Sequence, residues 1–301
     1  MKKEEIYIGG VKVNFGYRIE DVLAFVDKIV KDSGSFGHYI CTTGPEFVIT
    51  AQKDTEFKEI INNSDVSIPD GYGVVLARKY LETIGVRKYP KFLLYRIVWN
   101  FIIGMGIGVA SFLHKDELNK EKITGVEIFK KITEVSAERK YKLFLLGGRK
   151  KDIVGRQDMS KDVSQELADK IRSIYPNIEI VGTTSQFNFQ SSDDKNTLDY
   201  IHQCMNEKGI SNIDILFIAY GHPHQEKWII RNSKSIPVKI SIGIGGTFDY
   251  LTGHIRECPL LIQRFGLEWL YRLFIQPWRI GRIFTAFPTF PFLVYKKSID
   301  K

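Results

Sequence analysis

Short apolar runs alternate with longer amphipathic stretches over most of the chain. Six apolar runs end in glycine or in a polar turn, at residues 38–44, 65–71, 141–148, 178–183, 213–221 and 238–246. Stretches with apolar positions at helical spacing lie among them, at 19–31, 53–62, 74–81, 123–139 and 163–175. Strands that are apolar on both faces and alternate with helices are typical of a parallel sheet covered on both sides. We therefore predict an α/β fold, a Rossmann-like mostly parallel sheet with helices on both faces.

The residues that end these runs indicate where a ligand binds, because such sheets bind ligands beyond the carboxyl ends of their strands. The residues expected at that edge are Thr42, Asp70, Gly147, Gly148, Gly221, Gly245 and Gly246. Asp70 stands between Pro69 and Gly71, and Pro-Asp-Gly is also a common turn. The spacing alone leaves two interpretations of Asp70, a turn former or a carboxylate that faces a pocket.

The alternation of strands and helices stops after about residue 255. We predict an α/β core over residues 1–255 and a C-terminal basic helical appendage over 256–301, with a helix at 260–276 and an irregular apolar end. The appendage has eight Lys or Arg residues, three acidic residues and ten aromatic residues, so it carries +5 of the net charge of +8. This composition indicates contact with phosphate groups of a nucleotide or a membrane surface. Nucleic acid is a poorer partner, because the basic residues lie beside an apolar tail and not along a broad stripe.

An apolar segment at 92–113 lies within an apparent insertion at about 85–120. It is about as long as a bilayer span, but it contains Arg96, Asn100 and three glycines. We favour a membrane-contacting helix at the bilayer surface over a buried core helix and over a transmembrane helix. The glycines of GMGIGVA (104–110) do not complete a dinucleotide-binding fingerprint, because Val109 stands where the third glycine is expected.

Three widely spaced cysteines favour neither a disulfide framework nor a zinc site, and they fit a reducing cytoplasm. The N-terminus lacks the apolar core of a signal peptide. His222 and His224 flank a proline without a third ligand nearby, and the chain contains no Asp-x-Asp pair. We predict neither a metal nor another cofactor.

Seven motifs occur in a fixed order along the chain. They are TTGPEFV (42–48), IPDGYGVVLARK (68–79), ITGVEIF (123–129), LFLLGG (143–148), GHPHQEKWI (221–229), GIGGTFDYLTGHIRECP (243–259) and GLEWLYRLFIQPWRIGR (266–282). With these motifs the chain resembles the WecG/TagA/CpsF family of bacterial glycosyltransferases, except near 85–120 and over about the last dozen residues. The resemblance implies transfer of a sugar from a UDP-sugar donor to a polyprenyl-diphosphate-linked saccharide during synthesis of teichoic acid, capsule or a related polymer. It also implies a peripheral or monotopic place at the cytoplasmic face of the cell membrane.

The resemblance gives roles to the residues at the expected edge. Asp70 corresponds to the proposed catalytic base, and a carboxylate suits that role because it accepts the acceptor's hydroxyl proton. Thr42 and Gln225 would position the sugar. Arg272, Arg279 and Arg282 would neutralise the diphosphate in place of a metal ion, since guanidinium groups bind phosphate in a bidentate manner.

Several residues keep a second interpretation. Arg272 also fits a surface ion-pair ladder with neighbours four and eight residues earlier. Asp249 fits either a bond to the ribose or base, or a helix N-cap. For Glu226, a cap or an ion pair with Lys227 is as good an alternative as a role in the pocket. Glycine pairs 147–148 and 245–246 fit both backbone contact with a nucleotide and tight turns.

Three departures from the family pattern leave the donor sugar open. Gly44 replaces an asparagine, Lys122 replaces an arginine, and Gln186 begins a stretch that lacks the usual Gly-Tyr-Phe. A non-catalytic nucleotide- or phosphate-binding module at the membrane is the main alternative function, and a sugar-nucleotide hydrolase is a third. The acceptor linkage and the oligomeric state are not predicted.

Overall fold

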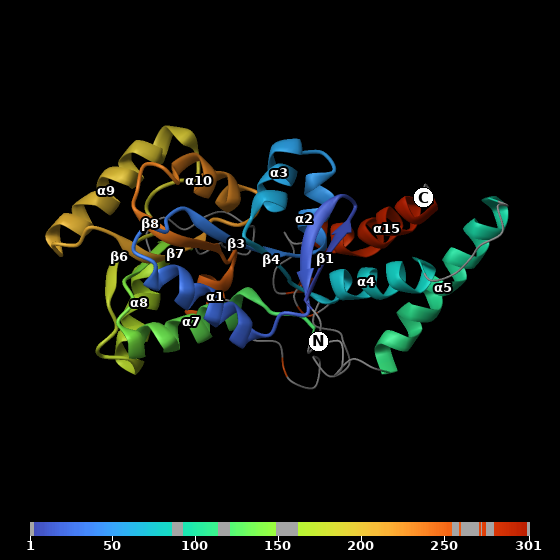
Figure 1. The fold of residues 1–301 in the computed structure, drawn as a ribbon, viewed down its shortest axis with the longest axis horizontal. Helices are drawn as coiled ribbons and strands as arrows, with labels where there is room; N and C mark the ends of the chain where they lie inside the picture. The colour runs from blue at the N-terminus through green and yellow to red at the C-terminus, as the bar shows by residue number, and fades with distance from the viewer. Residues whose placement is uncertain are drawn as a thin grey trace.

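A six-stranded parallel sheet forms the centre of the molecule (Figure 1). The computed structural model describes residues 3–85, 93–113, 121–148, 162–254, 259, 271, 273, 274 and 280–299. The strands lie in the order β4-β3-β8-β7-β5-β6. Their bounds are β3 His38–Thr43, β4 Val66–Pro69, β5 Leu143–Gly147, β6 Ile180–Thr184, β7 Ile213–Ala219 and β8 Val238–Gly243. Five lie within the predicted apolar runs, β6 ends one residue beyond its run at 178–183, and the predicted fold class is confirmed.

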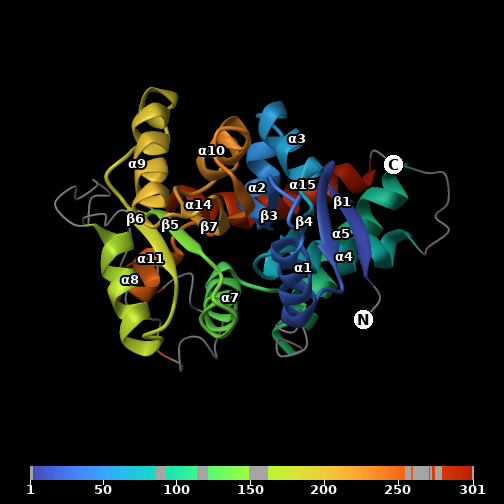
Figure 2. The same ribbon diagram turned by 60° about the vertical axis from the view of Figure 1, so that its left-hand side comes forward.

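Helices cover both faces of the sheet, as Figure 2 shows. One face packs against α1 (Ile19–Lys31), α7 (Gly125–Arg139), α8 (Val163–Ile174) and α11 (Thr247–Leu251). The other packs against α2 (Pro45–Ala51), α3 (Thr55–Asn63), α4 (Tyr72–Gly85), α9 (Asp194–Glu207) and α10 (His224–Asn232), with a short 3-10 turn at Ser191–Asp193. Alternate residues of β7 serve the two cores: Ile215 and Phe217 face the first, and Leu216 and Ile218 the second. The amphipathic stretches predicted as helices are confirmed.

An antiparallel hairpin that is absent from the predicted elements covers the β4 edge of the sheet. It consists of β1 (Glu4–Ile8) and β2 (Val11–Phe15), joined at Gly9 and Gly10, whose φ angles are +59° and +77°. The Asn14 side-chain oxygen accepts a hydrogen bond from Ser67 N–H at 2.8 Å, so the hairpin satisfies part of the sheet edge. The alternation in IYIGGVKV, with Gly-Gly at its centre, is the hairpin signal that was overlooked.

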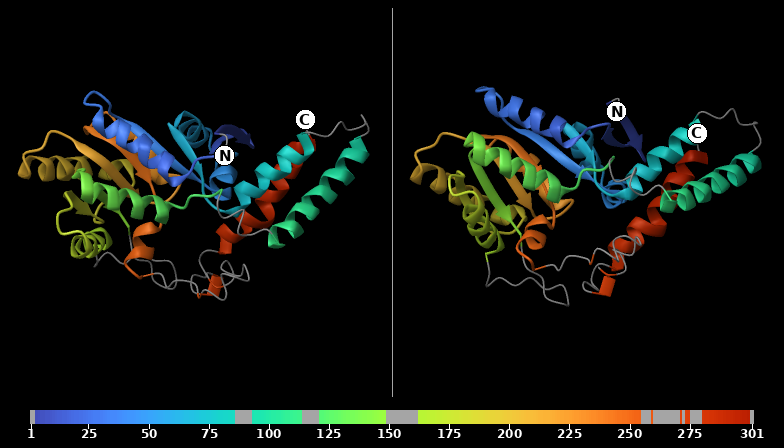
Figure 3. Two further views of the ribbon diagram at one scale, coloured as in Figure 1. Left: turned by 60° about the horizontal axis from the view of Figure 1, so that its bottom comes forward. Right: turned by 90° about the horizontal axis from the view of Figure 1, so that it is seen from below.

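A separate layer of helices extends from the end of the molecule where the chain termini lie (Figure 3). It contains α4, α5 (Leu93–Leu113) and α15 (Phe290–Ile299), which contact one another. A short α14 (Ile280–Phe284) leads into α15 through a kinked segment at Thr285–Thr289, in which Phe287 has non-helical φ and ψ angles of −157° and 120°. The prediction of an irregular apolar end is therefore wrong for residues 290–299, which are helical. Pro291 lies in the first turn of α15, where a missing N–H costs no helical hydrogen bond.

The interpretation of 92–113 as a buried core helix is also wrong, because α5 exposes one apolar side to solvent. Its glycines lie inside a helix and not in a dinucleotide-binding loop. Within the described ranges, no helix is long and apolar enough to cross a membrane. Most of the predicted helix at 260–276 and the boundary at 255/256 lie outside the described residues, so the division into core and appendage stays a prediction.

Candidate active site

Asp70 lies directly after β4, at the carboxyl edge of the sheet. Its N–H donates a hydrogen bond to the Thr43 carbonyl at 3.0 Å, which ties the end of β4 to the end of β3. The next residue, Gly71, has φ of +95°, a conformation that favours glycine. A Cβ on Gly44 would lie 3.0 Å from the Asp70 carbonyl oxygen, so the two turns pass very close to each other. The Pro-Asp-Gly stretch is thus a turn, and it leaves the carboxylate at the edge where a ligand is expected.

Thr42 links the next pair of strands. Its hydroxyl donates to the Gly243 carbonyl at 3.1 Å, and the side chain is buried. The hydroxyl therefore holds β3 against β8 at the carboxyl edge. Its role in positioning a sugar stays a prediction.

Gln225 joins the loops that follow β7 and β8. Its side-chain oxygen accepts hydrogen bonds from Gly221 N–H at 3.1 Å and Gly245 N–H at 3.0 Å. Its amide nitrogen donates to Glu226 Oε1 at 2.7 Å. A Cβ on Gly243 would lie 2.5 Å from that nitrogen, so glycine is needed for Gln225 to fit. Because the oxygen already has two donors, any contact of Gln225 with a sugar is left mainly to its remaining N–H.

Glu226 is fully buried behind Gln225. Burial raises the pKa of its carboxyl to about 7, although the hydrogen bond from Gln225 acts in the opposite direction. Among the described residues, none donates a hydrogen bond to Oε2. The alternative of an ion pair with Lys227 is wrong, because Lys227 points the other way and pairs with Asp54 at 2.8 Å and Glu56 at 2.6 Å.

The glycine pairs are explained first by backbone conformation and packing. Gly147 and Gly148 have φ of +89° and +81°. A Cβ on Gly148 would lie 2.8 Å from the Phe248 ring, and the Gly148 N–H donates to the Ala219 carbonyl at 3.1 Å. Gly245 has φ of +55°, and its N–H is bound to Gln225. The amides of Gly148 and Gly245 are therefore already used within the protein, and tight turns account for both.

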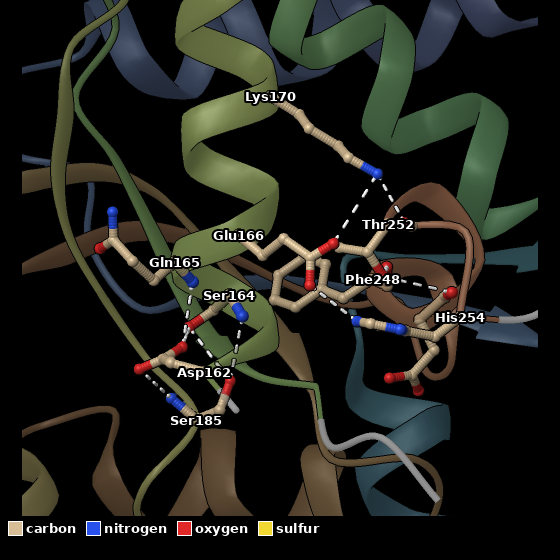
Figure 4. Close-up of polar contacts among 10 residues, drawn as sticks. Asp162, Ser164, Gln165, Glu166, Lys170, Ser185, Phe248, Thr252 and His254 are labelled. Atoms are coloured by element: carbon tan, nitrogen blue, oxygen red, sulfur yellow. Dashed lines mark hydrogen bonds and ion pairs between the residues drawn. The ribbon is translucent and has the colours of Figure 1, made fainter. Parts of the chain in front are cut away.

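Asp249 lies inside α11, whose N-cap is Gly246, so the alternative that Asp249 is an N-cap is wrong. Polar contacts fasten the end of α11 to α8 (Figure 4). His254 Nε2 lies 2.7 Å from Glu166 Oε2, and Lys170 donates to the Thr252 carbonyl at 2.5 Å. This clamp fixes the position of α11 and hence of Asp249 on it.

The N-terminus of α8 already holds a carboxylate. Asp162 accepts hydrogen bonds from Gln165 N–H at 3.0 Å and from Ser185 N–H at 3.2 Å (Figure 4). The Ser185 hydroxyl in turn donates to the Gly147 carbonyl at 2.8 Å. The dipole of a helix favours a negative group at its N-terminus, and the Asp162 carboxylate is that group in α8. A diphosphate is accordingly disfavoured at this helix.

Arg282 of α14 contacts the carboxyl edge of the sheet at the start of α2, the helix that follows β3. Its Nε lies 3.0 Å from Glu46 Oε2 in the first turn of α2, and its Nη2 donates to His222 Nδ1 at 3.3 Å. Burial, together with the Arg282 charge, lowers the pKa of His222 to about 3, so this imidazole is neutral. His222 also packs against the Phe47 ring, with centroids 4.8 Å apart. Glu46 is not among the site residues predicted from the sequence, where its only signal is an acidic residue directly after Gly44-Pro45.

Arg272 and Arg279 lie outside the described residues, so their predicted roles and the proposed ion-pair ladder of Arg272 are not tested. Lys122 is described: its Nζ lies 4.1 Å above the Tyr72 ring. Ile123 N–H donates to the Pro69 carbonyl at 3.1 Å, which brings the 121–124 segment beside Asp70. In the ranges that the structure describes, no three His, Cys, Asp or Glu side chains are grouped to hold a metal ion.

Comparison with known proteins identifies the family. The family model described as glycosyl transferase WecG/TagA/CpsF family matches residues 6–101 and 94–301. The chain belongs to this family. It is a glycosyltransferase, and the resemblance expected from the seven motifs is confirmed. The two stretches matched by the WecG/TagA/CpsF family model overlap at residues 94–101, within α5.

Two similar proteins carry the description N-acetylglucosaminyldiphosphoundecaprenol N-acetyl-beta-D-mannosaminyltransferase. The protein from Bacillus subtilis (strain 168) is 28% identical over 290 residues, which cover 96% of this chain and 91% of the relative. The protein from Bacillus spizizenii (strain ATCC 23059 / NRRL B-14472 / W23) is 25% identical over 247 residues, which cover 82% of this chain and 75% of the relative. The similarity therefore extends through the whole α/β core of this member of the WecG/TagA/CpsF family.

Proposed function

We propose that this glycosyltransferase moves a sugar, an N-acetylhexosamine or a related one, from a UDP-sugar to a polyprenyl-diphosphate-linked saccharide. The reaction inverts the anomeric carbon, requires no metal ion and serves the synthesis of a cell-surface polysaccharide. The names of the two relatives, which contain an undecaprenol-diphosphate-linked acceptor, support this acceptor class. The observation that carries the proposal is that Asp70 and Arg282 reach the same carboxyl edge, on either side of the turn between β3 and α2.

Asp70 acts as the general base. The acceptor hydroxyl oxygen attacks the anomeric carbon of the donor while its proton passes to the Asp70 carboxylate. The bond from that carbon to the β-phosphate oxygen breaks, and its electron pair leaves with UDP. Thr42 and Gln225 hold the strands and loops against which the sugar is positioned. General-base catalysis such as that of Asp70 typically accelerates a reaction by a factor of about 10² to 10⁴.

Arg282 neutralises the charge that develops on the departing diphosphate, and Arg272 and Arg279 are proposed to assist it. Two features support a diphosphate site near Arg282 over one at the N-terminus of α8 or at the glycine turns. Asp162 already occupies the N-terminus of α8, and the amides of Gly148 and Gly245 are used within the protein. Positively charged side chains therefore replace both the metal ion and the helix N-terminus as the anion site.

The lipid-linked acceptor places the enzyme at the cytoplasmic face of the cell membrane, as a peripheral or monotopic protein. Gly44 and Lys122 replace residues expected in the family, so N-acetylmannosamine is not assumed as the donor sugar.

The test is a transfer assay with a panel of UDP-sugars, a lipid-diphosphate-linked N-acetylglucosamine acceptor and EDTA, read by UDP release and product mass. We expect transfer from one donor despite EDTA. Asp70→Asn should lower the transfer rate by about 10² to 10⁴ and leave UDP binding intact. Asp199→Asn, the same change at an exposed position of α9, is the matched control.

Near-normal transfer by Asp70→Asn would exclude Asp70 as the base. UDP release without acceptor would indicate a hydrolase, and UDP binding without any turnover would favour a non-catalytic binding module. Activity that requires an added divalent cation would contradict the metal-independent mechanism.

A further inference from the structure

Helix α5 turns its polar side inward and its apolar side outward. The inner side follows positions 96, 100, 103 and 107, which recur at helical spacing. Asn100 and Ile103 of this side are buried against the rest of the molecule. The only charged residue of α5, Arg96, and its only amide side chain, Asn100, therefore both face protein.

The inner side is held to the last turn of α15 by hydrogen bonds. Arg96 Nη2 donates to the carbonyls of Ser298 at 3.3 Å and Ile299 at 2.8 Å. Asn100 Nδ2 donates to the Ser298 hydroxyl at 3.2 Å. Tyr295 of α15 returns a hydrogen bond to the Ile97 carbonyl at 3.0 Å. Arg96 is also favourable electrostatically, because it places a cation at the carboxyl end of a helix. Together these hydrogen bonds fix the rotation of α5 about its axis.

The outer side, which we call the α5 outer face, contains only apolar side chains. It consists of Leu94, Val98, Phe101, Ile102, Met105 and Val109, all exposed, with Leu94 at 74% and Val109 at 62%. A helix at the surface of a protein in water normally has the opposite arrangement, with polar residues outside. Contiguous exposed apolar surface of this kind marks a place where a partner or a membrane binds.

The charges of the helix next to α5 select the partner. Neither α5 nor α15, which contacts it, contains an acidic residue, whereas α15 contains Lys296 and Lys297. The same helix exposes Phe292. Apolar and aromatic side chains combined with basic residues alone are complementary to a bilayer surface that carries anionic lipids. The α5 outer face of a second copy would offer no acidic residues to pair with them.

We propose that the α5 outer face inserts into the interfacial region of an anionic lipid bilayer, with α5 lying along the membrane surface. Contact with α4 and α15 along its inner side keeps α5 from standing alone across the bilayer. Insertion of such a helix typically reaches about 5–10 Å, to the boundary between headgroups and acyl chains. The inference rests on the proposed function only for the presence of the lipid-linked acceptor in the same membrane.

The experiment is flotation of the full chain with vesicles of phosphatidylglycerol and phosphatidylethanolamine that contain no acceptor. The variant Val98→Ser/Ile102→Ser/Met105→Ser removes three side chains of the α5 outer face without touching its inner side. Its matched control is Tyr7→Ser/Ile174→Ser/Ile230→Ser, which changes three exposed apolar residues elsewhere. We expect the wild type and the control to float, and the α5 variant to partition on the order of a hundredfold more weakly, because three apolar side chains no longer leave water.

Equal flotation of the α5 variant and the wild type would overturn the proposal. So would a wild-type dimer in sedimentation velocity that the α5 variant loses while its flotation stays unchanged, since the face would then bind a second copy. Transfer to a short-chain, water-soluble acceptor separates this inference from the proposed function. The α5 variant should keep that transfer, and a wild type that floats through α5 but transfers nothing would refute the proposed function alone.

Discussion

Burial has a larger effect than charge pairing on the pKa values of the ionisable side chains behind Gln225. Glu226 has a lysine as its neighbour in the sequence, yet the helix turns the two in different directions, and the carboxyl lies in the core. Cys41, on the adjacent strand β3, has a pKa raised well above its ordinary value, with burial as the main cause and Glu226 as the second. The neutral forms of both groups are therefore favoured in the folded state.

Glu226 should make the stability of the protein depend on pH. Its pKa rises from 4.5 to about 7 on folding, so the folded state keeps a proton that the unfolded chain releases. The resulting stabilisation is complete below pH 4.5 and is lost as the pH rises to about 7. Glu226→Gln removes this dependence, and we expect the wild type to lose about 3 kcal/mol more than the variant over that range.

Urea unfolding of both proteins at about pH 5 and about pH 8 measures the difference, and Glu138→Gln on the exposed side of α7 is the control. Parallel changes in the free energy of unfolding of the wild type and Glu226→Gln would show that Glu226 is already ionised in the folded state.

The candidate active site lies where the turns after β3, β4, β7 and β8 meet α14, a helix from near the C-terminal end of the described chain. The ends of β3, β4 and β8 are joined by the hydrogen bonds of Thr42 and Asp70, and Gln225 adds the loop after β7. Among the described residues, α14 contacts this edge through the ion pair between Arg282 and Glu46. The neutral His222 accepts a hydrogen bond from the same guanidinium and adds no competing charge.

The carboxylate of Glu46 and a donor diphosphate should compete for Arg282. The Arg282 side chain is 43% exposed, so its ion pair with Glu46 is a weak one. We expect Glu46→Gln to tighten UDP binding by about two- to fivefold, measured by isothermal titration calorimetry, and Arg282→Gln to weaken it. Glu59→Gln, at an exposed position of α3, is the control. Weaker UDP binding by Glu46→Gln would mean that Glu46 orients Arg282 for the phosphate and does not compete with it.

The whole molecule combines a net charge of +8 with an exposed apolar helix, so two forces act in membrane binding. The charge term acts at a distance and is screened by salt, whereas the apolar term of the α5 outer face is not. The two are separable by experiment.

Flotation with anionic vesicles should weaken as sodium chloride rises from about 0.05 M to about 0.5 M, because the Debye length shortens. It should not disappear, since the α5 outer face still leaves water. Vesicles of phosphatidylcholine alone should bind more weakly and show little dependence on salt. Salt-independent binding to the anionic vesicles would rule out a role for the basic residues.

Most of the sheet was predictable because its strands are buried on both faces and read as continuous apolar runs. The helices at 19–31, 123–139 and 163–175 were predictable from their helical spacing. The hairpin β1–β2 is absent from the predicted elements although its Gly-Gly turn is a recognisable signal, and the prolines at the start of α15 predict an irregular tail where the structure has a helix. Asp70, Thr42 and Gln225 were predicted as site residues from strand ends and motifs. Glu46 was not, because its partner Arg282 is more than two hundred residues away in the sequence.

The α/β class, the six strand positions and the family follow from the sequence alone, since these depend on local periodicity and on motif order. Three features depend on tertiary contacts: which amides are already bonded, the burial of Glu226 in the core, and the contact of Arg282 with Glu46. The side of α5 that faces solvent depends on such contacts as well. Hydropathy along the chain predicts the same apolar helix whichever side faces solvent. The rotation of the helix is set by hydrogen bonds from Arg96 and Asn100 to α15, about two hundred residues away.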